Sequence, residues 1–111
     1  MKTTISTYQN DWENKSLPAI DALMAQMHTS GAIDILNWPE QYPNAPATIF
    51  TLAHTNDMLF VRFEVKDELP LATHIQDLEH VNEDACVEIF IANAANTRYW
   101  NFEFNAAGVC N

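Results

Sequence analysis

Glycine, cysteine and basic residues are scarce in this chain, and each scarcity excludes a class of function. Only 2 of the 111 residues are glycine, too few for the glycine-rich loops that cradle phosphate groups. The 2 cysteines are too few for a disulfide framework. Lysine and arginine number 5 against 15 acidic residues, which gives a formal net charge of -10. Nucleic acid and anionic membranes are therefore disfavoured as partners, because both need basic surfaces.

Long apolar runs are missing as well. No segment approaches the length of a membrane span, and the N-terminal residues lack the apolar region of a signal peptide. We therefore expect a cytoplasmic location by default, or a secreted or periplasmic one if a leader has been removed. The metal-binding motif His-Glu-x-x-His, paired Cys-x-x-Cys motifs and a P-loop are all absent from the sequence.

The composition is that of a globular chain, with 48% hydrophobic and 18% charged residues. At this length it predicts one domain at most. Residues 1–16 are polar and without periodicity, so we expect an N-terminal extension there and the domain over residues 17–111. Between residues 16 and 27, apolar side chains recur at every third or fourth position. This pattern predicts a helix, capped by Ser16, that packs one face on a sheet.

Beyond Gly31 the apolar period changes to two, which is typical of β-strands. Turn signals such as Thr-Asn-Asp separate short alternating segments, with no long helix between them. The pattern predicts an all-β fold: an antiparallel β-sandwich, or part of one, with the helix appended at its N-terminus. The expected strands span residues 33–35, 48–54, 58–67, 85–92 and 97–105.

Alternation along the last three expected strands sorts their side chains into two sets. If these strands are neighbours, Trp100, Phe102 and Phe104 point into the core. The polar set shares the other face, where carboxylates and amides can bind hydroxyl groups and Tyr99 can stack on a pyranose ring. We expect a neutral saccharide there, and the alternative is a solvated outer face with cross-strand Arg–Glu pairs. The candidate ligand-binding residues are Arg62, Glu64, Glu88, Tyr99, Asn101, Glu103 and Asn105.

Two further features bear on ligand chemistry. Trp38, in a proline-rich segment, either stacks on a ligand or plugs the end of a core. The acids Glu64, Glu88 and Glu103 include candidates for the carboxylate pair of a glycosidase, but nothing in the sequence fixes their separation. An enzyme is therefore the minor alternative.

The acidic loop over residues 68–84 also allows two interpretations. Its carboxylates are either solvated or bind calcium, which takes several oxygen ligands. The candidate metal ligands are Asp77, Glu83 and Asp84. Cys86, which follows the loop inside an apolar strand pattern, is expected to be a buried free thiol.

Four segments in order carry a family resemblance. They are "LNWPEQYP" at residues 36–43, "LAHTNDMLFVRFEVKD" at 52–67, "EDACVEIFI" at 83–91 and "YWNFEFNAAG" at 99–108. At these spacings the chain resembles the family 9-like carbohydrate-binding domains of bacterial sugar-related proteins. The resemblance covers roughly residues 17–111. It implies a jelly-roll-like β-sandwich, sugar binding, no catalysis, and often bound calcium.

The family's site residues carry over only in part. Glu88 matches a glutamate that hydrogen-bonds the sugar in the family. The stacking tryptophan of that motif is replaced in the region of Val81 and Asn82, and a sugar-contacting arginine is matched by Glu103. The resemblance therefore implies a non-catalytic carbohydrate-binding module. The alternative is a structural or interaction domain of the same fold that has lost sugar binding.

Domains of this family are longer than this chain, so we expect the sequence to be the N-terminal part of such a domain. An incomplete sandwich leaves a sheet edge and an apolar face uncovered. We therefore expect either self-association, which would cover them, or a longer polypeptide from which this chain comes.

Overall fold

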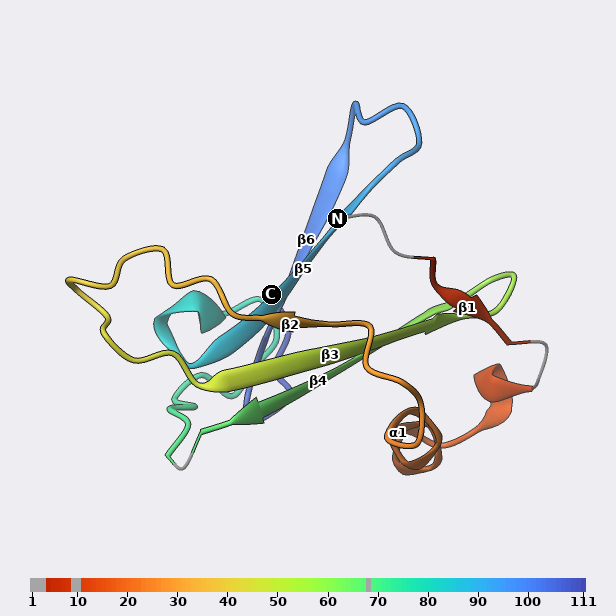
Figure 1. The fold of residues 1–111 in the computed structure, drawn as a ribbon, viewed down its shortest axis with the longest axis horizontal. Coiled ribbons are helices and arrows are strands. Elements are labelled where there is room, and N and C mark those ends of the chain that lie inside the picture. Colours follow the sequence, from red (N-terminus) through yellow and green to blue (C-terminus); the bar gives the residue numbers. More distant parts are fainter. Residues whose placement is uncertain (1–3, 9–10, 68) are drawn as a thin grey trace. The chain divides into compact units, whose positions relative to one another are not determined.

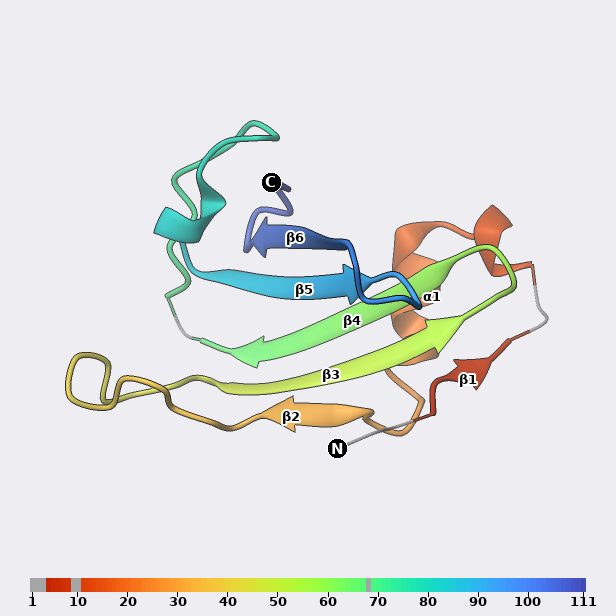
Figure 2. The same ribbon diagram turned by 90° about the horizontal axis from the view of Figure 1, so that it is seen from above.

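The computed structural model describes residues 4–8, 11–67 and 69–111. The chain divides into two compact units, Met1–Asp67 and Glu68–Asn111. Each unit has its own β-sheet, and the α-helix belongs to the first (Figures 1 and 2).

The helix α1 spans Leu17–Met24. Ser16 caps it, because its hydroxyl oxygen accepts a hydrogen bond from the Ala19 N–H at 3.4 Å. Ile20 and Met24, one turn apart, are buried. The predicted helix is therefore confirmed, although it ends before residue 27.

The main hairpin of the first unit pairs β3 (Ala47–His54) with β4 (Leu59–Lys66) in antiparallel register along their whole length. Its turn is held by Thr55, whose hydroxyl oxygen accepts from the N–H groups of Asp57 and Met58 at 3.4 and 3.2 Å. This hairpin and its Thr-Asn-Asp turn were predicted, and they are confirmed.

Two short strands lie along the other edge of β3 (Figure 2). β1 (Ser6–Thr7) pairs with it in parallel, and β2 (Gly31–Ile33) pairs with it antiparallel. Gly31 stands opposite Phe50, and a Cβ at Gly31 would lie 2.6 Å from the tip of that ring. β2 begins and ends two residues earlier than the strand predicted over residues 33–35, and no larger residue fits at Gly31 unless the Phe50 ring moves.

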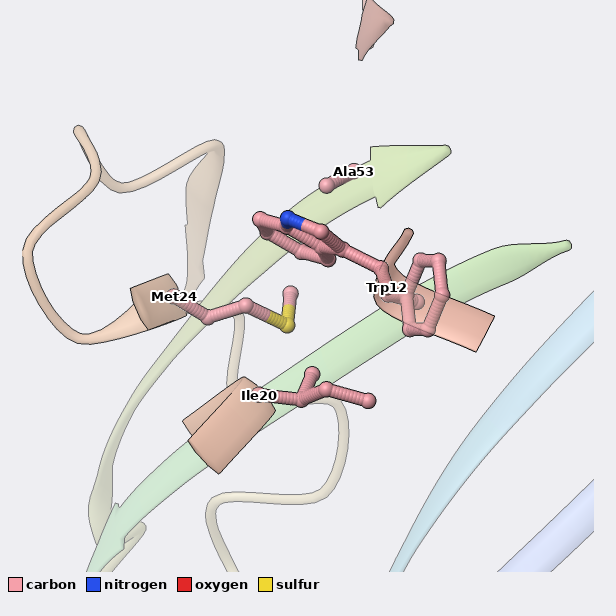
Figure 3. Packing of buried hydrophobic residues seen from close by; sticks show 5 residues of the cluster. Trp12, Ile20, Met24 and Ala53 are labelled. Carbon is pink, nitrogen blue, oxygen red and sulfur yellow. The ribbon is translucent and has the colours of Figure 1, made fainter. Parts of the chain in front are cut away.

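The core of the first unit forms between helix α1, the hairpin and Trp12, which opens the 3₁₀-helix η1 (Trp12–Asn14) (Figure 3). Trp12 is only 2% exposed. Its ring stacks on Tyr8 at 4.9 Å between centroids and meets Phe60 edge-on at 5.2 Å. Part of the segment predicted as an extension therefore belongs to the core, and the sequence carried no periodic signal for it. The buried cluster comprises Trp12, Ile20, Met24, Ala53 and Phe60.

The second unit is built on a hairpin of β5 (Cys86–Ala92) and β6 (Tyr99–Asn105). After β6 the chain turns at Gly108, which has a left-handed φ of 81°. Residues 109–111 then run back along β6, and the backbones of Glu103 and Asn111 exchange two hydrogen bonds. The 3₁₀-helix η2 (Val81–Glu83) precedes the hairpin.

The part of the chain that the structure describes is mostly β, with two sheets and one α-helix. It confirms the all-β prediction with an N-terminal helix. β4 pairs with β3 in the first unit, and β5 pairs with β6 in the second. Across the described ranges, no helix combines the length and the apolar character needed to cross a bilayer.

Candidate functional site

The β5–β6 hairpin presents two chemically different faces, which its register defines. Cross-strand pairs join Glu88 to Glu103 and Ile89 to Phe102, and side chains alternate from there. The predicted grouping of the β6 candidates on one face is therefore confirmed. The apolar face consists of Val87, Ile89, Ile91, Trp100, Phe102 and Phe104. The polar face consists of Cys86, Glu88, Phe90, Ala92, Tyr99, Asn101, Glu103 and Asn105.

Two carboxylates lie opposite each other at the centre of the polar face. Glu88 is exposed and Glu103 is half-buried. The two oxygens of Glu103 accept hydrogen bonds from the side-chain amides of Asn101 at 2.9 Å and Asn111 at 3.3 Å. Glu88 has only a weak contact of 3.9 Å from the Cys86 sulfur. One carboxylate is therefore held in place, while the other is open to solvent.

The negative charge of this face affects the pKa of the Cys86 thiol. Burial raises its pKa, and the neighbouring carboxylates of Glu88 and Glu103 raise it further, because they repel a thiolate. Cys86 is free, as predicted, and it is half-buried. Its raised pKa keeps it a neutral thiol rather than a nucleophile.

Asn101, beside Glu103 on the polar face, has a side-chain amide that is only partly hydrogen-bonded. Its amide nitrogen donates to Glu103, but its buried side-chain oxygen has no hydrogen-bond partner among the described residues. A buried carbonyl oxygen without a donor is costly and is usually explained by a missing partner. The interior side of the polar face therefore contains one acceptor without a partner among the described residues.

An aromatic pair borders these polar groups. Tyr99 and Phe90 are 68% and 61% exposed, and their ring centroids lie 5.8 Å apart at an interplanar angle of 45°. Phe90 was not predicted as a site residue. The alternation of β5 provides the signal, because it places Phe90 on the same face as Glu88.

Asn105, predicted as a ligand contact, is instead a structural residue. It is buried, and its amide nitrogen donates to the His74 carbonyl and to Asp84, both at 2.9 Å. Its amide oxygen accepts from the N–H groups of Ala107 and Val109. All of its hydrogen-bonding capacity is used inside the unit, so no part of it is left for a ligand.

Asp84 is likewise committed to the fold. Its two carboxylate oxygens accept from the N–H and hydroxyl of Thr73, the His74 N–H and Asn105, at 2.7 to 3.0 Å. Burial alone would raise the pKa of Asp84, but these hydrogen bonds outweigh it and hold the pKa well below its usual range.

The three predicted metal ligands make contacts within the second unit. The oxygens of Asp84 already have donors, Asp77 accepts from the Cys110 N–H at 3.0 Å, and Glu83 lies 3.9 Å from the His74 ring. In the described part of the chain, no three His, Cys, Asp or Glu side chains form a group that could hold a metal ion.

The assignment of the β6 aromatics to a core is wrong. Trp100, Phe102 and Phe104 are 52%, 38% and 36% exposed. Alternation correctly places them on one face, but it does not say whether another element covers that face. The apolar face therefore stands beside the polar face as a second surface to be explained.

The remaining candidates belong to the first unit. Arg62 forms ion pairs with Asp21 on α1 at 2.8 Å and with Glu64 at 3.0 Å, so it ties the helix to its sheet. Trp38 lies in the segment between β2 and β3 and is 65% exposed, which argues against its being a core plug. The structure thus groups Glu88, Tyr99, Asn101 and Glu103 and leaves the other candidates outside that group.

Carboxylate and amide groups on a sheet face can exchange hydrogen bonds with the hydroxyl groups of a polyhydroxylated ligand. The sequence matches Carbohydrate-binding family 9 over residues 18–111. The chain belongs to this family, which confirms the resemblance found in the sequence. No curated protein and no solved structure matches it. Membership supports a carbohydrate-binding module in general, and a binding family fits a chain that is not an enzyme.

Proposed function

We propose that the chain is a non-catalytic module that binds a saccharide on the polar face of the β5–β6 hairpin. The observation that carries the proposal is the grouping of Glu88, Glu103 and Asn101 beside the exposed rings of Tyr99 and Phe90. Carboxylate and amide oxygens accept from sugar hydroxyls, while an exposed ring packs against the apolar side of a pyranose. The family match supplies the ligand class, and the face supplies the chemistry.

The strand pair also gives this face the rigidity that a binding site needs. Seven cross-strand residue pairs fix the hairpin, and Asn101 and Asn111 hold the Glu103 carboxylate from either side. A site built on strands loses little conformational entropy when it binds.

The test is a titration of isotope-labelled protein with a panel of monosaccharides and oligosaccharides, followed by NMR. Binding is expected to shift the signals of Tyr99 and Asn101, and Tyr99→Ala is expected to weaken it by about tenfold, since loss of ring packing costs roughly 1.4 kcal/mol. Trp100→Ala, which removes the adjacent aromatic on the apolar face, is the matched control and is expected to bind normally. A larger loss in the control would move the site to the apolar face.

A second candidate is an interaction domain that keeps the fold without the sugar site. In the region of the family's missing stacking tryptophan, Val81 is fully buried and Asn82 is exposed, so neither residue supplies an aromatic ring to a ligand. The exposed apolar face could then serve association between copies. No saccharide binding at millimolar concentrations, combined with self-association, would favour this candidate.

A further inference from the structure

The polar face is rich in acceptors and poor in donors. Glu88 and Glu103 contribute four carboxylate oxygens, and each oxygen of Glu103 already accepts one hydrogen bond, from Asn101 or from Asn111. On the donor side, one hydrogen of the Asn101 amide is committed to Glu103 and the Cys86 thiol contacts Glu88 weakly, which leaves the second Asn101 hydrogen and the Tyr99 hydroxyl. The polar face therefore favours a ligand that donates more hydrogen bonds than it accepts.

The two carboxylates also lack a cation. The ion pairs formed within the described residues involve neither Glu88 nor Glu103. Like charges directly opposite each other on neighbouring strands destabilise the pairing. The raised pKa of the adjacent Cys86 thiol, caused by burial and then by these two acids, reflects the same unbalanced charge. A positively charged group placed between them would therefore be stabilising.

We infer that the ligand of this face is an amino sugar, a saccharide that carries a protonated amine. This inference rests on the saccharide site proposed above. The ammonium group donates to Glu88 and Glu103, and the sugar ring packs on Tyr99 and Phe90. Charge-assisted hydrogen bonds are about twice as strong as neutral ones. This replaces the neutral saccharide expected from the sequence, which would leave both charges uncompensated.

The experiment compares glucosamine with glucose and N-acetylglucosamine, which share its ring but lack the charge. NMR titrations run in mildly acidic, low-salt buffer, where the amine is protonated. Glucosamine is expected to bind about tenfold more tightly than either neutral sugar, equivalent to roughly 1.4 kcal/mol. The preference should shrink at high salt, because exposed charges are screened.

Two isosteric variants test the assignment. Glu88→Gln and Glu103→Gln each remove one charge while keeping the side-chain shape, and each is expected to bring the two affinities to within about threefold. Glu40→Gln, at an exposed position of the first unit, is the matched control for net charge and should leave the preference unchanged. Unaltered amide spectra of the free variants show that they are folded.

The outcomes distinguish failure of the amino-sugar inference from failure of the proposed saccharide binding. Equal affinity for glucosamine and glucose, or a preference that survives both variants, overturns the inference but leaves saccharide binding intact. Equal shifts with ethanolamine, an amine without a sugar ring, also overturn it, because they reveal mere attraction to an acidic chain. If no sugar shifts the Tyr99 and Asn101 signals, the inference and the proposed function both fail.

Discussion

A single buried amide, that of Asn105, connects three parts of the second unit. It joins the His74 backbone, the Asp84 carboxylate and the turn that leads to Val109. Four hydrogen bonds converge on this one side chain. It holds the acidic loop and the C-terminal residues to the end of β6.

Replacement of Asn105 by alanine is expected to lower the free energy of unfolding of the second unit by about 3 kcal/mol, because it leaves buried donors and acceptors unpaired. Chemical denaturation followed by NMR would measure this change. Asn82→Ala, at an exposed position of η2, is the control and should cost no more than about 0.5 kcal/mol. Similar losses in the two variants would contradict the structural role of Asn105.

Asp84 makes the stability of the second unit depend on pH. Because the folded-state pKa lies below the unfolded value, the carboxylate contributes its full stabilisation above the ordinary pKa of about 4. That contribution falls as the pH drops further toward the depressed value. Acid unfolding, followed through the Thr73 and His74 amide signals, is expected below about pH 4. The Asp84→Asn variant should show a flatter dependence on pH, and an unchanged slope would contradict the assignment.

At the scale of elements, the segment before α1 is part of the first unit. Trp12→Ala is expected to cost about 3–5 kcal/mol, as for other large aromatics truncated in a core. Denaturation of the first unit would measure it. Trp38→Ala removes an equally large but 65% exposed ring, and it should change stability by about 0.5 kcal/mol or less. Equal effects would show that Trp12 is not a core residue.

The sequence predicted elements well where the apolar period was regular. Helix α1 and the β3–β4 and β5–β6 hairpins were all predicted from period and turn residues. Trp12 was missed because a lone aromatic in a polar segment has no periodicity, and its burial depends on residues up to 48 positions later, such as Phe60. Local pattern cannot report such contacts.

The candidate site was predictable in its membership more than in its details. Alternation grouped Glu88, Tyr99, Asn101 and Glu103 correctly, because the side-chain period of a strand is fixed. It could not show that Asn105, on the same face, is buried under the loop. It also could not show that the β6 aromatics are exposed, because alternation distinguishes two faces without saying what covers either.

At the scale of the whole molecule, the apolar face and the net charge of -10 have opposite effects on the association of copies of the chain. Exposed apolar surface favours association of copies, while like net charge opposes it. Self-association through this face is therefore expected to strengthen as salt is added, because salt screens the repulsion. Light scattering coupled to size-exclusion chromatography would follow the mass at rising salt. A double variant, Trp100→Ser with Phe102→Ser, should remain monomeric throughout, and a wild-type protein that is monomeric at every salt concentration would contradict the prediction.

The three tryptophans of the chain occupy three separate environments. Trp12 is sealed in the first unit's core, Trp38 is exposed in the segment after β2, and Trp100 is half-exposed on β6. Their fluorescence contributions can therefore be distinguished. Trp12 should emit at short wavelength and resist quenching by iodide. Trp38 and Trp100 should emit at longer wavelength and be quenched readily. With Trp38 replaced by phenylalanine, the two remaining fluorophores give each unit its own optical reporter. The melting of the two sheets can then be followed separately in one intact chain.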